Sequence, residues 1–329
     1  MRVGIVGVGG MGNTHANKYR QMRDVELSAY DVDPERLATF CVKTGAEARG
    51  SLDHLIDCCD IVDICLPTHL HMATAGQAIH AGRATFVEKP MAGNVVDCRT
   101  MIQAAEREGV LLMPGQVVRF FPEFATGRRL VHSGSIGTPA AARTRRGGKA
   151  PVGAGGWFKD AAKSGGILLD LAVHDFDWLR WTLGEVRHVF ARTVQIRPEW
   201  LLEHQPPEVG DYALTTLTFD SGCVAHVETT WLDPGGSRAT FEVCGSGGMI
   251  EFDSRQSATV RTTTGDGSRL EAPLAPDDDP YYLQLRSFVD AVKNRTQPPV
   301  SAWDGLAAVA IAEAAIESAK TGMVVPVVT

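Results

Sequence analysis

An aspartate and a histidine stand four residues apart, at Asp170 and His174, after the double glycine that begins at Gly165. The apolar periodicity around them predicts one helix over about residues 167–183. Its apolar stripe consists of Leu168, Ala172, Phe176, Leu179 and Leu183, and the opposite side carries Asp170, His174, Asp177 and Trp181. A carboxylate and an imidazole one turn apart can address one substrate, because histidine ordinarily titrates near neutral pH and accepts protons there. From the helix alone, however, a solvated polar face is the commoner interpretation.

A glycine-rich turn follows the first predicted strand, at residues 1–6. The turn is a G-x-G-x-x-G motif formed by Gly7, Val8, Gly9, Gly10, Met11 and Gly12, with a helix predicted over residues 13–22 and a second strand over residues 26–30. In such a unit the first glycine permits a tight turn, the second admits a pyrophosphate and the third lets helix and strand pack closely. The amides at the helix N-terminus favour the anion. The sequence therefore predicts a dinucleotide site.

Asp31 ends the second predicted strand, 19 residues after Gly12. A carboxylate at this place accepts hydrogen bonds from the ribose hydroxyls of NAD and repels the 2′-phosphate of NADP. Arg36 lies close enough in the sequence to weaken this argument. NAD is therefore favoured, and NADP stays open as the alternative.

Strands and helices alternate up to about residue 118, which predicts a doubly wound parallel sheet with helices on both faces. Ligands bind such sheets at the carboxyl ends of the strands. Besides the glycine turn and Asp31, the residues expected there are Leu66, Pro67, Thr68, His71, Glu88, Lys89 and Gln116. Thr68 is also expected to cap a helix over residues 69–81. Lys89 is expected to carry its ammonium group to the cofactor site, although a surface lysine in a turn is an equally simple interpretation.

The composition limits the class of protein. The 329 residues include 32 basic and 39 acidic side chains, a net charge of −7, and seven cysteines. The length predicts two domains, and the lack of a block of one charge argues against nucleic acid or a membrane surface as the main partner. No C-x-x-C pair, signal peptide or membrane span is recognisable, so we expect a cytoplasmic protein without a metal site.

Residues 119–329 are different in pattern from residues 1–118. Strand-like runs separated by turns predict an α+β domain with a large, mostly antiparallel sheet. Two helices are expected near the end of the chain, over about residues 281–293 and 303–319. The last helix is rich in alanine and could pack back onto the first domain.

Three motifs stand in an order that resembles one known family. They are GVGGMG at residues 7–12, EKP at residues 88–90 and SGGILLDLAVHDFDWLRW at residues 164–181. Together they resemble the glucose–fructose oxidoreductase/inositol dehydrogenase (Gfo/Idh/MocA) family over essentially the whole chain, and His15 after the glycines is similar too. The chain departs from the family with two glycines before Ile167 where many relatives have three, and with Ala172 where glycine is common. Neither departure affects a reactive side chain.

The resemblance implies an NAD(P)-dependent oxidoreductase that transfers hydride between the nicotinamide and a secondary alcohol or ketone of a sugar or cyclitol. It implies that Lys89, Asp170 and His174 match the residues that family members use on substrate, and that the chain forms a homodimer or homotetramer. His174 would accept the hydroxyl proton, Lys89 would hydrogen-bond the same oxygen and Asp170 would orient the carbon. Candidate substrate-wall residues, each with an equally good structural interpretation, are Arg119, Trp157, Lys163, Asp177 and Trp231.

Three other activities stay open. The same site could reduce a keto-sugar or imine, or cleave a glycoside through a transient oxidation with no net redox change. A non-catalytic regulator that senses NAD and a sugar is a third possibility. The presence of Lys89, Asp170 and His174 argues against the regulator, because a sensor needs no proton acceptor.

Overall fold

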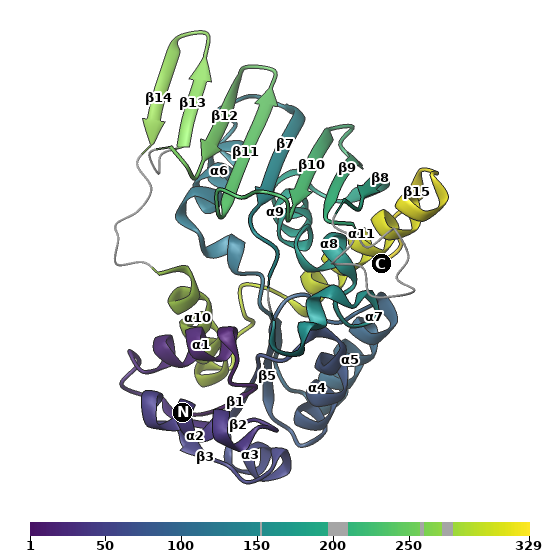
Figure 1. Ribbon diagram of the computed structural model, residues 1–329. Coiled ribbons are helices and arrows are strands. Elements are labelled where there is room, and N and C mark those ends of the chain that lie inside the picture. Colours follow the sequence, from purple (N-terminus) through teal and green to yellow (C-terminus); the bar gives the residue numbers. More distant parts are fainter. Residues whose placement is uncertain (152, 197–209, 257–259, 272–278) are drawn as a thin grey trace. The chain divides into compact units, whose positions relative to one another are not determined.

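The computed structural model describes residues 1–151, 153–196, 210–256, 260–271 and 279–329. The chain divides into two compact units, each with its own sheet (Figure 1). The first unit contains Met1–Val117 and a later segment that ends at Leu306. The second unit contains the segment that begins at Val118 and lies between those two, together with Ala307–Thr329 at the end of the chain.

The first unit contains a six-stranded parallel sheet in the order β3-β2-β1-β4-β5-β6. Its strands are β1 (Arg2–Val6), β2 (Glu26–Tyr30), β3 (Glu47–Ala48), β4 (Ile61–Ile64), β5 (Ala84–Val87) and β6 (Leu112–Pro114). Every residue of β4 and β5 is buried, as in parallel sheets with helices on both faces. The strand order reverses between β1 and β4, and ligands bind at such a switch point. The predicted doubly wound sheet is confirmed.

Local sequence determines where the helices of the first unit begin and end. These helices are α1 (Gly10–Tyr19), α2 (Pro34–Thr44), α3 (Leu52–Cys58), α4 (His71–His80), α5 (Val95–Glu108) and α10 (Pro280–Asn294), and a short 3₁₀ helix, η1 (Thr68–Leu70), precedes α4. The Asp33 side chain accepts hydrogen bonds from the first amides of α2, and Ser51 does the same for α3. Gly45 ends α2 in the left-handed conformation, with φ of 75°.

Helix α10 belongs to the first unit, although the predicted division at residues 118 and 119 assigned it to the second. It packs against α1. Lys18 Nζ lies 2.7 Å from Asp279 Oδ2 at the start of α10, and Arg286 Nη1 lies 2.7 Å from Asp24 Oδ1. The chain thus returns to its first unit through charges more than 250 residues apart, which periodicity does not reveal. Helix α11 (Ala302–Thr321) then contributes residues to both units.

The second unit contains a nine-stranded sheet in the order β14-β13-β12-β11-β7-β10-β9-β8-β15. Its strands are β7 (Pro139–Gly147), β8 (Val186–Val194), β9 (Tyr212–Phe219), β10 (Val224–Thr230), β11 (Arg238–Gly245), β12 (Gly248–Asp253), β13 (Val260–Thr264), β14 (Gly267–Glu271) and β15 (Val325–Pro326). Among the described strands of this nine-stranded sheet, only β7 and β10 pair in parallel. The predicted, mostly antiparallel sheet is confirmed.

One face of this sheet is covered by helices, among them α6 (Pro122–His132) and α9 (Val173–Leu183). Aromatic rings fill the space between them. The ring of Phe124 lies 5.4 Å from that of Trp178 and 5.3 Å from that of Phe241, and the Trp178 indole donates to the Phe124 carbonyl. Rings at such separations bury much apolar area and stabilise the unit.

The predicted single helix over residues 167–183 is wrong, because the structure has α8 (Gly166–Asp170) and α9 with a break between them. The Ala172 amide donates to the Ile167 carbonyl, five residues back, and the α-helical pattern resumes from Ala172. The predicted polar side is not solvated either, since Asp170 and Asp177 are buried. In a segment enclosed on nearly all sides, an apolar stripe does not identify the buried face.

No helix in the described part of the chain combines the length and the apolar content that a membrane span needs.

Candidate cofactor and active site

The glycine turn between β1 and α1 has the geometry that a dinucleotide requires. Gly7 has φ of 91°, in the left-handed region, and a Cβ there would lie 2.7 Å from the Cys65 carbonyl oxygen. A Cβ at Gly12 would lie 2.1 Å from the Gly7 oxygen, whereas a Cβ at Gly9 would meet no atom within 4 Å. The first and third glycines therefore allow the turn and the close packing, and the second leaves open space for a ligand.

The N-terminus of α1 has room for an anion. Gly9 is the N-cap and provides no side-chain hydrogen bond, and the first turn contains no acidic residue. The first amides of a helix have no partner within the helix and carry a partial positive charge. Pyrophosphate oxygens match these amides.

The Asp31 carboxylate is held beside this turn at the end of β2. Its Oδ2 accepts from the Val8 amide at 2.9 Å, and its Oδ1 accepts from the Asp33 amide at 2.9 Å. The Val8 amide is therefore occupied by Asp31. Arg36, which had weakened the argument for NAD, lies 3.3 Å from Asp33.

Two buried polar side chains, one after β4 and one after β6, have no hydrogen-bond partner among the described residues. They are Thr68, through Oγ1, and Gln116, through both atoms of its amide. Leaving such a group unpaired costs about 1–3 kcal/mol, so a polar ligand that reached them would be bound favourably. Thr68 does not cap a helix as expected, because it begins η1 and α4 starts only at His71. Glycine turn, fixed carboxylate and unpaired polar groups together fit a dinucleotide.

Glu88, Lys89 and Pro90 follow the end of β5, and two histidines lie on either side of them. Glu88 is buried, and its Oε2 accepts from the Lys89 amide at 3.1 Å. His71 is buried with Nδ1 2.9 Å from the Pro90 oxygen and Nε2 2.8 Å from the Leu66 oxygen. His71, predicted to contact the cofactor, thus has both ring nitrogens directed at backbone carbonyls.

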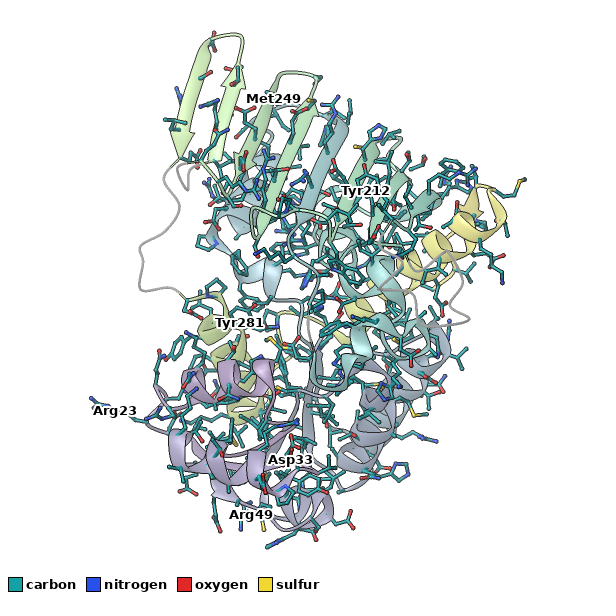
Figure 2. The ribbon with its side chains drawn as sticks, viewed as in Figure 1. Arg23, Asp33, Arg49, Tyr212, Met249 and Tyr281 are labelled. Carbon is teal, nitrogen blue, oxygen red and sulfur yellow. The ribbon has the colours of Figure 1, made fainter. Side chains whose placement is uncertain are left out.

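Sequence reasoning missed the buried cluster of His15 and Asp63. His15 Nδ1 lies 2.8 Å from Asp63 Oδ2 and its Nε2 lies 3.2 Å from Glu88 Oε1. Burial lowers the pKa of His15, but the Asp63 carboxylate outweighs this effect and the pKa is raised well above its ordinary value. Figure 2 labels Tyr281 of α10, whose ring lies 6.4 Å from that of His15. The only signal in the sequence was the position of His15, three residues after Gly12.

In the second unit, Asp170 ends α8 and His174 lies in the first turn of α9. Asp170 is buried and His174 is half-buried. The substrate and cofactor roles predicted for individual residues stay predictions.

Two of the candidate substrate-wall residues form a buried ion pair. Arg119 Nε and Nη2 donate to the Asp177 carboxylate at 2.8 and 2.6 Å, and both side chains are almost fully buried. The alternative of a solvent-facing Asp177 is therefore wrong, since a charge in the interior needs a partner.

The remaining wall candidates also have contacts within the second unit. Trp157 stacks on Phe158 with ring centroids 3.8 Å apart, and Trp231 is buried with its amide donating to the Asp211 oxygen. Lys163 Nζ lies 3.0 Å from Asp160.

Comparison with known proteins agrees with this architecture. Residues 1–116 match the model of the oxidoreductase family with an NAD-binding Rossmann fold, and residues 124–251 match the GFO/IDH/MocA C-terminal domain. Myo-inositol 2-dehydrogenase of Thermotoga maritima is 32% identical, covering 97% of this chain and 96% of that protein. Inositol 2-dehydrogenase 3 of Saccharopolyspora erythraea is 30% identical, covering 99% and 95%.

Solved structures show the same fold over the full length. Levoglucosan dehydrogenase in complex with NADH and levoglucosan has a TM-score of 0.91 at 25% identity, with all of both chains covered. GenD2 from gentamicin A biosynthesis in complex with NAD has a TM-score of 0.88 at 28% identity, covering 100% of this chain and 97% of that one. With two matching family models and relatives along its whole length, the chain belongs to the GFO/IDH/MocA family of oxidoreductases and binds NAD through its Rossmann fold.

Proposed function

We propose that the chain is an NAD-dependent dehydrogenase that oxidises a secondary alcohol of a sugar or cyclitol. The observation that carries the proposal is the Asp31 carboxylate held against the glycine turn, beside strand ends that also carry Lys89. The substrate class is supported by the relatives, which are named for inositol and levoglucosan.

When bound, NAD supplies the hydride acceptor. We assign the accompanying proton to His174, because an imidazole can accept it near neutral pH and return it in the reverse direction. Lys89 donates a hydrogen bond to the same substrate oxygen and stabilises the negative charge that develops on it. Asp170 accepts a hydrogen bond from a neighbouring hydroxyl and so orients the reacting carbon.

The role of His174 is tested by His174→Ala. Turnover should fall by roughly 10²–10⁴-fold, the usual contribution of general acid–base catalysis. The dissociation constant of NAD, measured by fluorescence titration, should change little. His188→Ala, on β8 of the same unit, is the matched control and should keep wild-type turnover. Wild-type turnover by His174→Ala on the same substrate would rule out the assignment.

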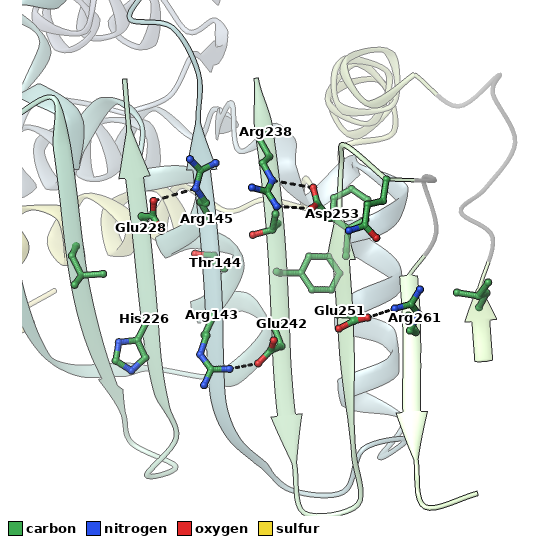
Figure 3. Close-up of a pocket in the computed structure, with 16 residues that line it drawn as sticks. Arg143, Thr144, Arg145, His226, Glu228, Arg238, Glu242, Glu251, Asp253 and Arg261 are labelled. Atoms are coloured by element: carbon green, nitrogen blue, oxygen red, sulfur yellow. Dashed lines mark hydrogen bonds and ion pairs between the residues drawn. The ribbon is translucent and has the colours of Figure 1, made fainter. Parts of the chain in front are cut away.

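We further propose that two copies associate through the face of the nine-stranded sheet that α6 and α9 do not cover. This face has a hollow of about 440 Å³ (Figure 3). Cross-strand ion pairs line it, namely Arg143–Glu242, Arg145–Glu228, Arg238–Asp253 and Arg261–Glu251. Because it carries both charges in equal number, the face can meet a rotated copy of itself with opposite charges facing. This contact alone gives a homodimer, and it supplies one of the interfaces that a homotetramer needs.

We also propose the cytoplasm as the compartment. All seven cysteines are free thiols, although two of them, Cys58 and Cys59, are adjacent in the sequence. Free thiols are typical of a reducing compartment.

A further inference from the structure

On the basis of the role proposed above for Lys89, we propose that His15 and His71 are positioning residues that hold Lys89 by fixing its two neighbours, Glu88 and Pro90. Neither histidine is exposed to a ligand, since their residues are 0% and 1% accessible. Each instead joins the turn that carries Lys89 to another part of the first unit.

His15 fixes the Glu88 side. It projects from α1, directly after the glycine turn, and its Nε2 lies 3.2 Å from Glu88 Oε1. The other oxygen of the same carboxylate accepts from the Lys89 amide. Gly115 leaves the room that this carboxylate needs, because a Cβ at Gly115 would lie 2.9 Å from Oε1. The carboxylate therefore links α1 to the backbone of Lys89.

The His15 ring is hydrogen-bonded through Nδ1, and its Nε2 meets Glu88 as an ion pair without hydrogen-bond geometry. Asp63 faces Nδ1, Glu88 faces Nε2, and the Cys65 sulfur lies 3.3 Å from Nδ1. Burial raises the pKa of the Cys65 thiol, which therefore stays neutral. An N–O separation of 2.8 Å is that of a hydrogen bond, which joins His15 Nδ1 to Asp63 Oδ2.

His71 fixes the Pro90 side. It is the first residue of α4, and its ring lies between the Pro90 oxygen at 2.9 Å and the Leu66 oxygen at 2.8 Å. Burial lowers the pKa of His71, and the two carbonyls partly offset that effect. A protonated ring donates to both oxygens and a neutral ring to one. The protonated ring therefore bonds the turn after β5 and the segment after β4 at once, whereas the neutral ring bonds one of them to α4.

The two anchors lie next to the predicted cofactor residues. Glu88 forms an ion pair with the helix that follows the glycine turn, and the His71 ring lies between the carbonyls of Pro90 and Leu66, two residues before Thr68. Lys89 is thereby fixed relative to the dinucleotide site. Positioning of this kind matters because a displacement of about 1 Å can cost about 10²-fold in rate.

A double-mutant cycle distinguishes positioning from a merely structural role. The variants are His15→Gln, His71→Gln, Lys89→Met and the two doubles, each assayed for kcat, KM and thermal unfolding. Each histidine variant alone should lower kcat by about 10-fold to 100-fold, with smaller changes in KM. In the Lys89→Met background the same substitutions should lower kcat by less than about twofold, because residues that act as a unit are not additive.

The matched controls are exposed histidines of the same unit. His80 lies at the other end of α4 and His54 lies on α3. The variants His80→Gln and His54→Gln should both keep wild-type kcat. Glu88→Gln keeps the size of the side chain and removes the charge that meets His15. If His15→Gln does not fold, Glu88→Gln takes its place in the cycle with the same expected result.

Two outcomes overturn the positioning role. The first is a wild-type kcat in the histidine variants. The second is a kcat of each double variant that is lowered by the full product of the losses in its two single variants. Failure of the proposed function looks different, because Lys89→Met itself would then retain wild-type turnover. An impaired Lys89→Met with unimpaired histidine variants removes the positioning role alone.

Discussion

At the scale of single residues, the carboxylates of this chain differ in what holds them. Asp63 is buried against a histidine and Asp177 against an arginine, so both charges are neutralised within their unit. Asp31, at the end of β2, is held by two backbone amides, and no cationic side chain of the described residues forms an ion pair with it. Backbone amides fix the position of a carboxylate without neutralising its charge, which suits a group that selects a cofactor.

Asp31→Asn should therefore weaken the use of NAD. A hydrogen bond to a charged group contributes about 1.5–3 kcal/mol, so kcat/KM for NAD should fall by roughly 10-fold to 100-fold. The ratio of NADP to NAD activity should rise, since repulsion of the 2′-phosphate is lost. Glu35→Gln makes the same change in charge at an exposed position of α2 and should leave both values unchanged. An unaltered preference in Asp31→Asn would contradict the assignment.

At the scale of elements, much of the secondary structure follows from the sequence. The strand at residues 26–30 begins and ends where the sequence predicts, and α10 and α11 lie within two residues of the predicted helices at 281–293 and 303–319. The failures share a physical cause. The break before α9 and the return of α10 to the first unit both depend on packing between distant parts of the chain.

The candidate site likewise contains some features that local sequence predicts and others that depend on contacts between distant residues. The glycine turn and the carboxylate of Asp31 beside it could be predicted because they lie at fixed places within a strand–turn–helix unit, whereas the role of Lys89 stays a prediction. The pairs His15–Asp63 and Arg119–Asp177 join residues 48 and 58 positions apart, and no local pattern announces them. Tertiary contacts decide the partners of buried charges.

The open face of the nine-stranded sheet allows a test at this scale. Arg143→Glu places an acid beside Glu242 on the surface proposed for association, and like charges across an interface cost several kcal/mol. The mass measured by light scattering should fall toward that of a single chain. Arg107→Glu makes the same charge change at an exposed site on α5 and should keep the wild-type mass. An unchanged mass in Arg143→Glu would argue against this face.

At the scale of the whole molecule, the residues proposed to act in the reaction come from both compact units. The first holds the cofactor groups and Lys89, and the second holds Asp170 and His174. The family match extends over both units, so the order of motifs along the chain was the feature of the sequence that best indicated the activity.

The most direct test of the account follows the absorbance of reduced nicotinamide as the protein is mixed with a panel of inositols, hexoses and their keto forms, with NAD and NADP separately. We predict that NADH accumulates from NAD with at least one polyol. It should accumulate faster than NADPH accumulates from NADP with the same compound. Consumption of a glycoside without NADH would indicate redox-assisted cleavage instead. Binding of NAD and sugar with no turnover of any compound would contradict an enzymatic role.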